Sequence, residues 1–289
     1  MFESLDHAHA TAVDILPAHA IVPAMAQLIP AIGIRPVSTD RIGGTRIDGT
    51  PDVSPEFEWP VADLSVHPDL SRFDVSAEEL PSGPSPLWFL AQVDLAEAHA
   101  LGEVAELLPD HGRLLFFFDH IAGSYLEGPE AVRVIWDRSP VDKLQTAQAP
   151  AALVSRGAHL IYPPKPSELF ASVTTPQRGS LCPETEPLFE LIDEGNHPLS
   201  PWADEFDEFC EADDCFVEPE WRHHQMLGIP VPCQSDPRGY IAPDSADEWV
   251  NLLCYANVEV REGEVYFLIR KSDLAARDFT KVAGVYMQT

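Results

Sequence analysis

The sequence predicts an α+β protein, mostly antiparallel β-sheet with short peripheral helices, and three observations lead to this fold class. Runs of β-branched and aromatic residues of strand length recur along the chain, bounded by turn-forming residues. The 28 prolines favour turns and edge strands over long helices. A chain of 289 residues, of which 45% are hydrophobic, is also long enough to bury a substantial core.

The first 34 residues differ from the rest of the chain. Residues 11–34 are apolar and rich in alanine, but Pro17, Pro23 and Pro30 interrupt them, so we expect short helical pieces. Residues 1–34 are therefore interpreted as an N-terminal helical extension. The main domain is expected over residues 35–289, and its first part, to about residue 86, is dense in Gly, Pro, Ser and Asp and predicts an extended, turn-rich entry.

Segments with the composition of strands dominate the main domain. They are residues 86–95, 112–119, 131–137, 158–163, 169–175, 248–258, 264–271 and 281–289. We expect these strands to supply most of the hydrophobic core.

One acidic segment, SPWADEFDEFCEADD, predicts a helix. Ser200 is a candidate N-cap and Pro201 suits the first helical position, while acidic residues fill the first turns, where the helix dipole favours them. Trp202, Phe206 and Phe209 are spaced i, i+4 and i+7, which places them on one apolar stripe. We expect this stripe to pack into a core.

Two stretches of the chain share an order of features, namely a Gly/Pro turn, a bulky apolar strand, a glycine and an apolar-aromatic strand. The first runs from residues 43–44 to 112–119, and the second from residues 228–230 to 263–269. This order favours an internal duplication, with two related halves at about residues 35–178 and 179–289. Chance similarity between β-rich segments is the alternative.

Charge is the most unusual global property, because 18 Lys and Arg face 47 Asp and Glu and give a formal net charge of −29. Such a surface repels nucleic acid and anionic lipid, so neither is an expected partner. No Lys or Arg lies between Arg178 and Arg222. This acidic window is either a solvated surface or a docking surface for a basic protein.

Other features of the sequence concern its compartment. No apolar run reaches the ~18 residues of a membrane span, and the N-terminus lacks the positive start of a signal peptide. The five cysteines are scattered and suit reduced thiols. We therefore expect a cytoplasmic protein that does not bind membranes.

Four ordered motifs resemble a known family. They are RIGGTRIDGTP…FEWP, PLWFLAQVDLAE…LLPDHGRLLFFFD, HHQMLGIPVPCQSDPRG and WVNLLCYANVE…EGEVYFLIRKSDLAARDFTKV. Together they are similar to the YwqG-like bacterial family, a domain of unknown function, over residues 35–289. The resemblance implies an α+β protein on antiparallel sheet and no established reaction. The chain departs from the family pattern at RIGGTRIDGTPD, which is longer and more polar, and at LCYANVEVREGEV.

The stretch HHQMLGIPVPCQSD, which begins at His223, raises the question of a zinc site. Cys210, Cys215, His223 and His224 offer four zinc ligands. The Cys-x4-Cys spacing is wide, however, and adjacent histidines rarely both face one ion. We therefore expect no metal and no other cofactor, and a stiff turn built by the glycine and prolines at positions 228, 230 and 232.

Catalytic patterns are weak. The sequence has no Gly-x-Ser-x-Gly elbow, Walker loop, His-Glu-x-x-His motif or dinucleotide fingerprint. Cys182 and Cys233 are candidate nucleophiles, but no base can be assigned to either. The sequence leaves open whether the protein is an enzyme.

Two hypotheses of function follow. The first is a non-enzymatic binding protein that docks a basic partner, as an immunity protein neutralises a basic toxin, through Asp204, Asp207, Glu208 and Glu211. The alternative is a small-ligand-binding or hydrolytic protein with a cleft between the two halves. Its convergent polar residues are His224, Asp236, Arg238 and Arg270, and Asp119, Asp273 and Asp278 are further candidates to line the cleft.

Overall fold

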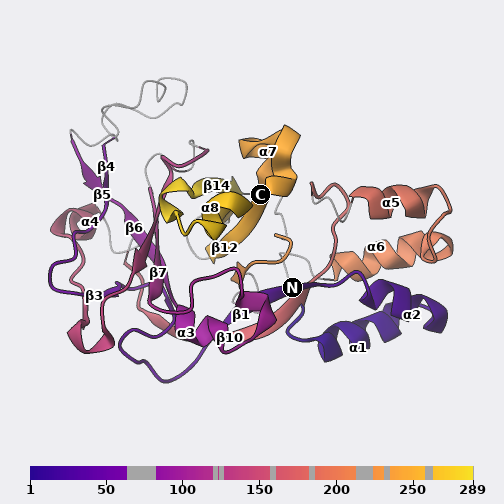
Figure 1. Cartoon of the computed structure of the whole chain (residues 1–289), viewed down its shortest axis with the longest axis horizontal. Helices are drawn as coiled ribbons and strands as arrows, with labels where there is room; N and C mark the ends of the chain where they lie inside the picture. The colour runs from indigo at the N-terminus through magenta and orange to yellow at the C-terminus, as the bar shows by residue number, and fades with distance from the viewer. Residues whose placement is uncertain are drawn as a thin grey trace.

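A computed structural model describes residues 1–63, 83–119, 123, 127–156, 161–181, 186–212, 224–230, 235–257 and 263–288, and most of its strands form one large antiparallel sheet (Figure 1). The strand order in this sheet is β14-β13-β12-β11-β1-β10-β2-β6-β7-β8. The bounds are β1 (Ile29–Pro36), β2 (Arg46–Ile47), β6 (Trp88–Asp94), β7 (Arg113–Phe118), β8 (Val132–Asp137), β10 (Lys165–Thr174), β11 (Gln225–Met226), β12 (Trp249–Asn257), β13 (Gly263–Arg270) and β14 (Ala283–Gln288). Together with its short helices, this sheet confirms the predicted α+β class.

The structure also contains two small sheets and several short helices. Two two-stranded sheets pair β3 (Asp52–Val53) with β9 (Gln145–Thr146) and β4 (Val61–Ala62) with β5 (Ser85–Pro86). Short helices are α3 (Leu95–His99), α4 (Ala151–Arg156), α7 (Arg238–Ile241) and α8 (Lys271–Ala275). Within the described ranges, no helix combines the length and the apolar character needed to cross a membrane.

The large sheet curls until its two ends almost meet. Gly128, just before β8, and Gly284 on β14 exchange backbone hydrogen bonds of 2.9 Å in both directions. A Cβ on Gly284 would lie 2.4 Å from Val132, so only glycine permits this approach. Inside the curl, Phe116 of β7 meets Phe267 of β13 edge to face, with ring centroids 5.1 Å apart. The concave side of the sheet is therefore filled by one continuous core.

The strands are arranged alike on the two sides of the central pair β1–β10, because on each side they follow one another in chain order from the centre to the edge. On one side lie β11, β12, β13 and β14, and on the other lie β2, β6, β7 and β8. Both β2 and β11 are followed directly by two residues with positive φ, Asp48–Gly49 at 63° and 78° and Leu227–Gly228 at 61° and 66°. The next strand on each side has a register shift, at residues 89–91 in β6 and 251–253 in β12. A duplicated unit gives this arrangement, although the duplication itself stays a prediction.

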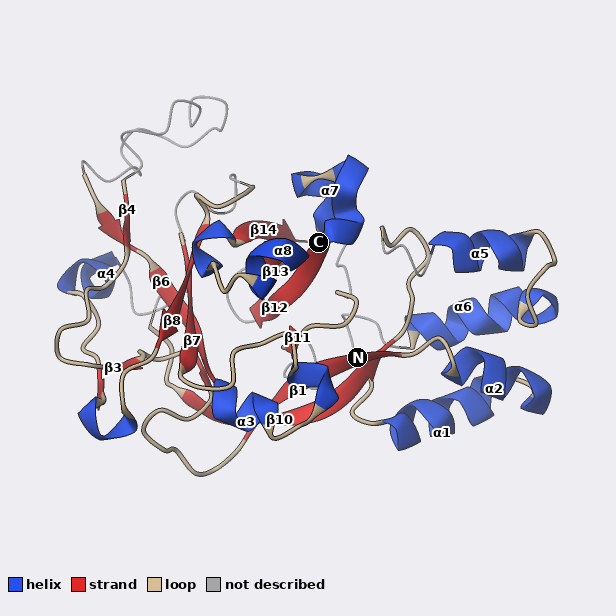
Figure 2. Cartoon of the chain, in the orientation of Figure 1, coloured by secondary structure: helices blue, strands red, loops and turns tan. Residues whose placement is uncertain are grey.

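Four helices form a separate lobe beside the sheet (Figure 2). They are α1 (Leu5–Ile15), α2 (Ala18–Met25), α5 (Glu186–Asp193) and α6 (Ala203–Glu211), and with their connections, residues 1–28 and 186–212, we call them the helical lobe. A second hydrophobic cluster fills it, which includes Phe206 and Phe209 and has Trp202 packed against it. The predicted apolar stripe of this helix is thus confirmed as core.

The helical lobe is tied to the sheet at the start of the chain. The backbone of Phe2 pairs with Val173 of β10, and its ring stacks on Phe209 at 5.4 Å between centroids. The two helices expected in residues 1–34 are present, but residues 29–34 fall within β1, at the centre of the sheet. The segment interpreted as an extension therefore also builds the main sheet.

Two local predictions need correction. Residues 161–163 are not in a strand, while residues 158–160 lie outside the described part of the chain. The acidic helix begins with a 3-10 turn at Ser200–Trp202 whose N-cap is Leu199, so Ser200 is not the N-cap. Its hydroxyl instead accepts a hydrogen bond from the His197 backbone N–H, because the chain turns sharply between α5 and α6.

Candidate functional site

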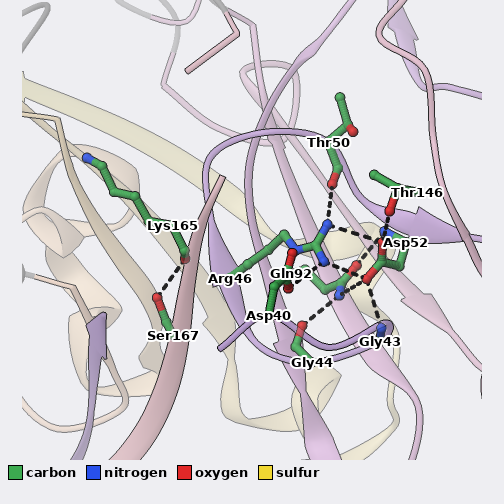
Figure 3. A network of polar contacts seen from close by, with 10 residues as sticks. All are labelled: Asp40, Gly43, Gly44, Arg46, Thr50, Asp52, Gln92, Thr146, Lys165 and Ser167. Atoms are coloured by element: carbon green, nitrogen blue, oxygen red, sulfur yellow. Dashed lines mark hydrogen bonds and ion pairs between the residues drawn. The ribbon is translucent and has the colours of Figure 1, made fainter. Parts of the chain in front are cut away.

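A buried polar network surrounds Arg46 on β2 (Figure 3). Arg46 is 1% exposed and Asp52 is fully buried. The two terminal nitrogens of Arg46 donate to the two carboxylate oxygens of Asp52 over 3.1 and 2.9 Å, and Nη2 also donates to Asp40 over 2.9 Å. This two-point contact is the strong form of an arginine–carboxylate pair.

The same carboxylate organises the loop that carries it. Asp52 accepts hydrogen bonds from the Gly43 backbone N–H and the Thr146 hydroxyl, each at 2.8 Å. The side-chain amide of Gln92 accepts from the Asp52 backbone N–H and donates to the Gly44 carbonyl, both over 2.7 Å. Both oxygens of Asp52 accept donors from within the chain, so this network holds the RIGGTRIDGTPD loop together.

A second polar cluster joins the two halves of the sheet. The Tyr255 hydroxyl on β12 donates to Oδ1 of Asp48, which follows β2, over 2.6 Å. Lys165 Nζ lies 3.4 Å from Oδ2 of the same carboxylate. The ring of His224 lies against Tyr255 at 5.2 Å between centroids, and Trp88 contacts Tyr255 edge to face. One cluster thus combines a carboxylate, a phenol, an ammonium and an imidazole, which lie at or next to the ends of β2, β12, β10 and β11.

Asp236 and Arg238, two of the four predicted ligand residues, form a buried ion pair with each other. Nε and Nη2 of Arg238 donate to Asp236, the latter over 2.5 Å, while the Ser180 hydroxyl and the Leu181 backbone N–H donate to Oδ2. Burial alone would raise the pKa of Asp236, but the hydrogen bonds and charge of Arg238 outweigh it and hold the pKa below its ordinary value. The pair anchors the segment before α7.

His224 and Arg270 lie near opposite ends of β12. Arg270 pairs with Glu248 over 2.7 Å and covers the Trp249 ring at 5.0 Å, at the first residue of β12. His224 lies against Tyr255, six residues further along, which corresponds to roughly 20 Å at a strand rise of about 3.3 Å per residue. Of the four predicted ligand residues, the structure thus brings Asp236 and Arg238 together, while His224 and Arg270 lie near opposite ends of β12.

Two of the three additional aspartates are neighbours, because the Asp278 backbone N–H donates to the Asp273 carbonyl over 2.9 Å. Asp119 is buried at the end of β7, Asp273 lies in the first turn of α8, and Asp278 caps the 3-10 turn Phe279–Lys281 by accepting from the Thr280 backbone N–H. Asp273 and Asp278 thus belong to the turn between α8 and the 3-10 turn, where Asp278 serves as a cap.

The predicted docking residues lie on α6 in the helical lobe. Asp204, Glu208 and Glu211 are exposed, on the side of the helix opposite Phe206 and Phe209. Asp207 differs, because it lies at the edge of this surface and pairs with Arg178 over 2.8 Å.

Arg178 precedes the acidic window in the sequence, and in the folded chain its side chain contacts residues of that window. Its guanidinium also pairs with Asp193 of α5 over 3.0 Å and covers the Phe189 ring at 4.5 Å. Asp193 and Asp207 are therefore partly neutralised, which leaves Asp204, Glu208 and Glu211 as the exposed docking candidates on α6.

Tertiary structure adds the N-terminal helices to this acidic surface. Residues 1–28 contain three acidic residues and residues 186–212 contain nine, and neither segment contains a Lys or Arg. The packing of α1 against α6 joins the two segments in one lobe. The sequence holds one sign of this arrangement, because no Lys or Arg precedes Arg35, but only the fold joins that segment to the acidic window.

The cysteine and zinc candidates are divided between the two cores. Cys210 lies in the core of the helical lobe, where burial raises the pKa of its thiol far above the usual range. His224 lies at the sheet, against Tyr255. The remaining candidates, Cys182, Cys215, His223 and Cys233, and also Pro232 of the predicted turn, lie outside the described residues. Gly228 has the positive φ of a tight turn, as predicted.

Comparison with known proteins gives a family without an activity. A family model described as a domain of unknown function, DUF1963, matches residues 45–287. The match begins after α1, α2 and β1, covers α5 and α6, and includes the other strands of the large sheet up to the last residue but one of β14. No curated protein matches the chain.

Proposed function

The chain belongs to the DUF1963 family, a domain of unknown function, and on that premise we propose that it is a non-enzymatic binding protein whose helical lobe docks a basic partner protein. The observation that carries this proposal is that two segments distant in the sequence, both without Lys or Arg, build the same lobe. A surface of one charge sign attracts a partner of the opposite sign and raises its rate of association.

The arrangement of the predicted ligand residues also favours docking over a pocket. Asp236 and Arg238 neutralise each other, and Arg270 pairs with Glu248. Asp204, Glu208 and Glu211 of α6, by contrast, face solvent, and α6 contains no Lys or Arg. Polar groups turned toward each other support the fold, while exposed charges of one sign are available to a partner.

The finer expectations belong to the same proposal. They are that the family is the YwqG-like bacterial one, that the protein works in the cytoplasm, and that it neutralises its partner in the manner of an immunity protein. The acidic lobe suits such a role because many toxins that act on nucleic acid are basic.

The alternative, a small-ligand or hydrolytic protein, has one observation in its favour. The cluster of Asp48, Tyr255 and His224 joins the two halves and combines groups that exchange protons. Asp48 also has a positive φ of 63°, and such strain in a residue other than glycine recurs at functional sites. A small molecule that protects Tyr255 or His224 from chemical modification would favour this alternative.

A matched pair of charge variants tests the docking proposal. The lobe variant is Asp204→Asn with Glu208→Gln and Glu211→Gln. The control changes the exposed residues Glu103→Gln, Glu106→Gln and Asp142→Asn, which lie outside the helical lobe. Both variants change the net charge equally, and a small, folded basic protein serves as the probe.

We expect the lobe variant to associate severalfold more slowly than the control at low salt, with the difference shrinking as the ~8 Å screening length near physiological salt is approached. Stopped-flow association rates over a series of salt concentrations measure this. Equal slowing of both variants would show that net charge alone attracts the probe, and the lobe would lose its assigned role.

A further inference from the structure

Helix α2 carries no charged residue, yet one of its faces is open to solvent. Its inner face consists of Ala20 and Ala24, which are fully buried, and on its outer face Val22 is 76% exposed. Apart from the exposed His19, the side chains of α2 are apolar, and a helix of such composition normally buries most of its surface. The outer side of α2, with Val22, is therefore an apolar surface that remains exposed to solvent.

The neighbouring helix extends this apolar surface. Leu5 and Val13 of α1 are 58% and 51% exposed, and α1 packs directly against α2. Ala8 and Ala12 fill the buried positions of α1 together with the half-buried Ile15, while Leu5 and Val13 remain exposed. Asp6 and Asp14 are exposed on the same helix. Exposed apolar side chains thus occur on both helices, and the acidic ones lie on α1.

Charge decides among the surfaces that would cover this face. An anionic membrane is repelled by a lobe that has acidic residues and no Lys or Arg. A second copy of the chain would bring two lobes of like charge together. A basic amphipathic helix satisfies both requirements, because its apolar stripe covers the valines while its Lys and Arg lie beside the carboxylates.

We infer that the outer face of α1 and α2, centred on Val13 and Val22, binds a basic amphipathic helix of the partner protein. This inference rests on the proposed docking function and specifies the partner's contact element. The apolar stripe supplies the contact that holds the complex together, and the charges steer the encounter and fix the orientation.

The test uses two synthetic peptides made of the same leucines and lysines. In one peptide the leucines recur at helical spacing and form a stripe, and in the other the same residues are shuffled so that no stripe forms. Val22→Ser on α2 is compared with Val154→Ser on α4, which lies in the sheet region away from the lobe and is 56% exposed (Figure 1). Isothermal titration calorimetry gives the affinities, and the thermal midpoints establish that both variants are folded.

We expect the striped peptide to bind more tightly than the shuffled one. Val22→Ser should weaken binding of the striped peptide by about tenfold, the effect of losing one valine buried on binding, and leave the shuffled peptide unaffected. Val154→Ser should change neither affinity.

Three results would overturn the inference. If both peptides bind equally well and Val22→Ser changes neither affinity, the apolar contact is excluded, while the docking proposal is not affected. Failure of both peptides to bind removes the docking proposal as well. Sedimentation that shows a wild-type dimer which Val22→Ser returns to monomer would assign the face to a second copy of the chain.

Discussion

The two sides of the large sheet build the same turn with different side chains. After β2, a terminal nitrogen of Arg46 donates to the carbonyl of Thr50, four residues ahead, over 3.2 Å. After β11, the amide of Gln225 donates to the carbonyl of Ile229, also four residues ahead, over 3.0 Å. In both cases a buried donor at the last but one strand position satisfies the carbonyl beyond a pair of positive-φ residues.

The difference lies in charge. Gln225 is neutral and its partner across the ladder is Cys254, whereas Arg46 faces Gln92 and needs Asp52 and Asp40 beside it. A buried cation has to be paired, so the charged donor brings a network with it, while the neutral donor does not. One geometric requirement is thus met by two chemical solutions, of which the charged one depends on more residues.

Replacement of Arg46 by Gln, the residue on the other side, tests this difference and should have the largest effect. It leaves Asp52 buried without its cation, which costs about 3–5 kcal/mol of unfolding free energy. Urea denaturation measures the loss. The double variant Arg46→Gln with Asp52→Val removes both charges of the pair and should recover part of the lost free energy. A single variant as stable as the wild type would mean that the ion pair is dispensable.

Phe116 and Phe267 occupy matching positions on β7 and β13 and contact each other across the curl. We expect Phe116→Ala and Phe267→Ala each to cost about 3–5 kcal/mol, because each opens a cavity in the same core. Since the rings touch, the double variant should cost less than the sum of the two. Additive losses in thermal or urea denaturation would indicate that the two sides are stabilised independently.

A smaller effect is expected from pH. Because the pKa of Asp236 is lower in the folded chain than its ordinary value of 3.8, its ionised form contributes stability above that value, and this contribution disappears as the pH falls through the folded pKa. Asp236→Asn should therefore lower the thermal midpoint at neutral pH and flatten its decline in acid. Asp110, exposed and paired with His111, offers the matched control as Asp110→Asn. Parallel acid profiles for Asp236→Asn and the wild type would contradict the prediction.

Sequence patterns predicted the strands well and the polar sites poorly. Strands such as 113–118 were found because their bulky apolar run is a local signal. The network around Arg46 was missed because its members Gln92 and Thr146 are 40 and 94 residues away from Asp52. Asp48 and Tyr255 are 207 residues apart, and no local sequence pattern at either residue predicts their hydrogen bond.

The sequence by itself determined the fold class, most of the strand segments other than the central β1, the buried stripe of Phe206 and Phe209, and the acidity of residues 186–212. Only the tertiary structure decided that α1 and α2 join those residues in one lobe and that Arg178 returns to pair with Asp193 and Asp207. The physical reason is that periodicity and composition specify which face of an element is apolar, whereas the partner of that face depends on how the whole sheet curls and closes.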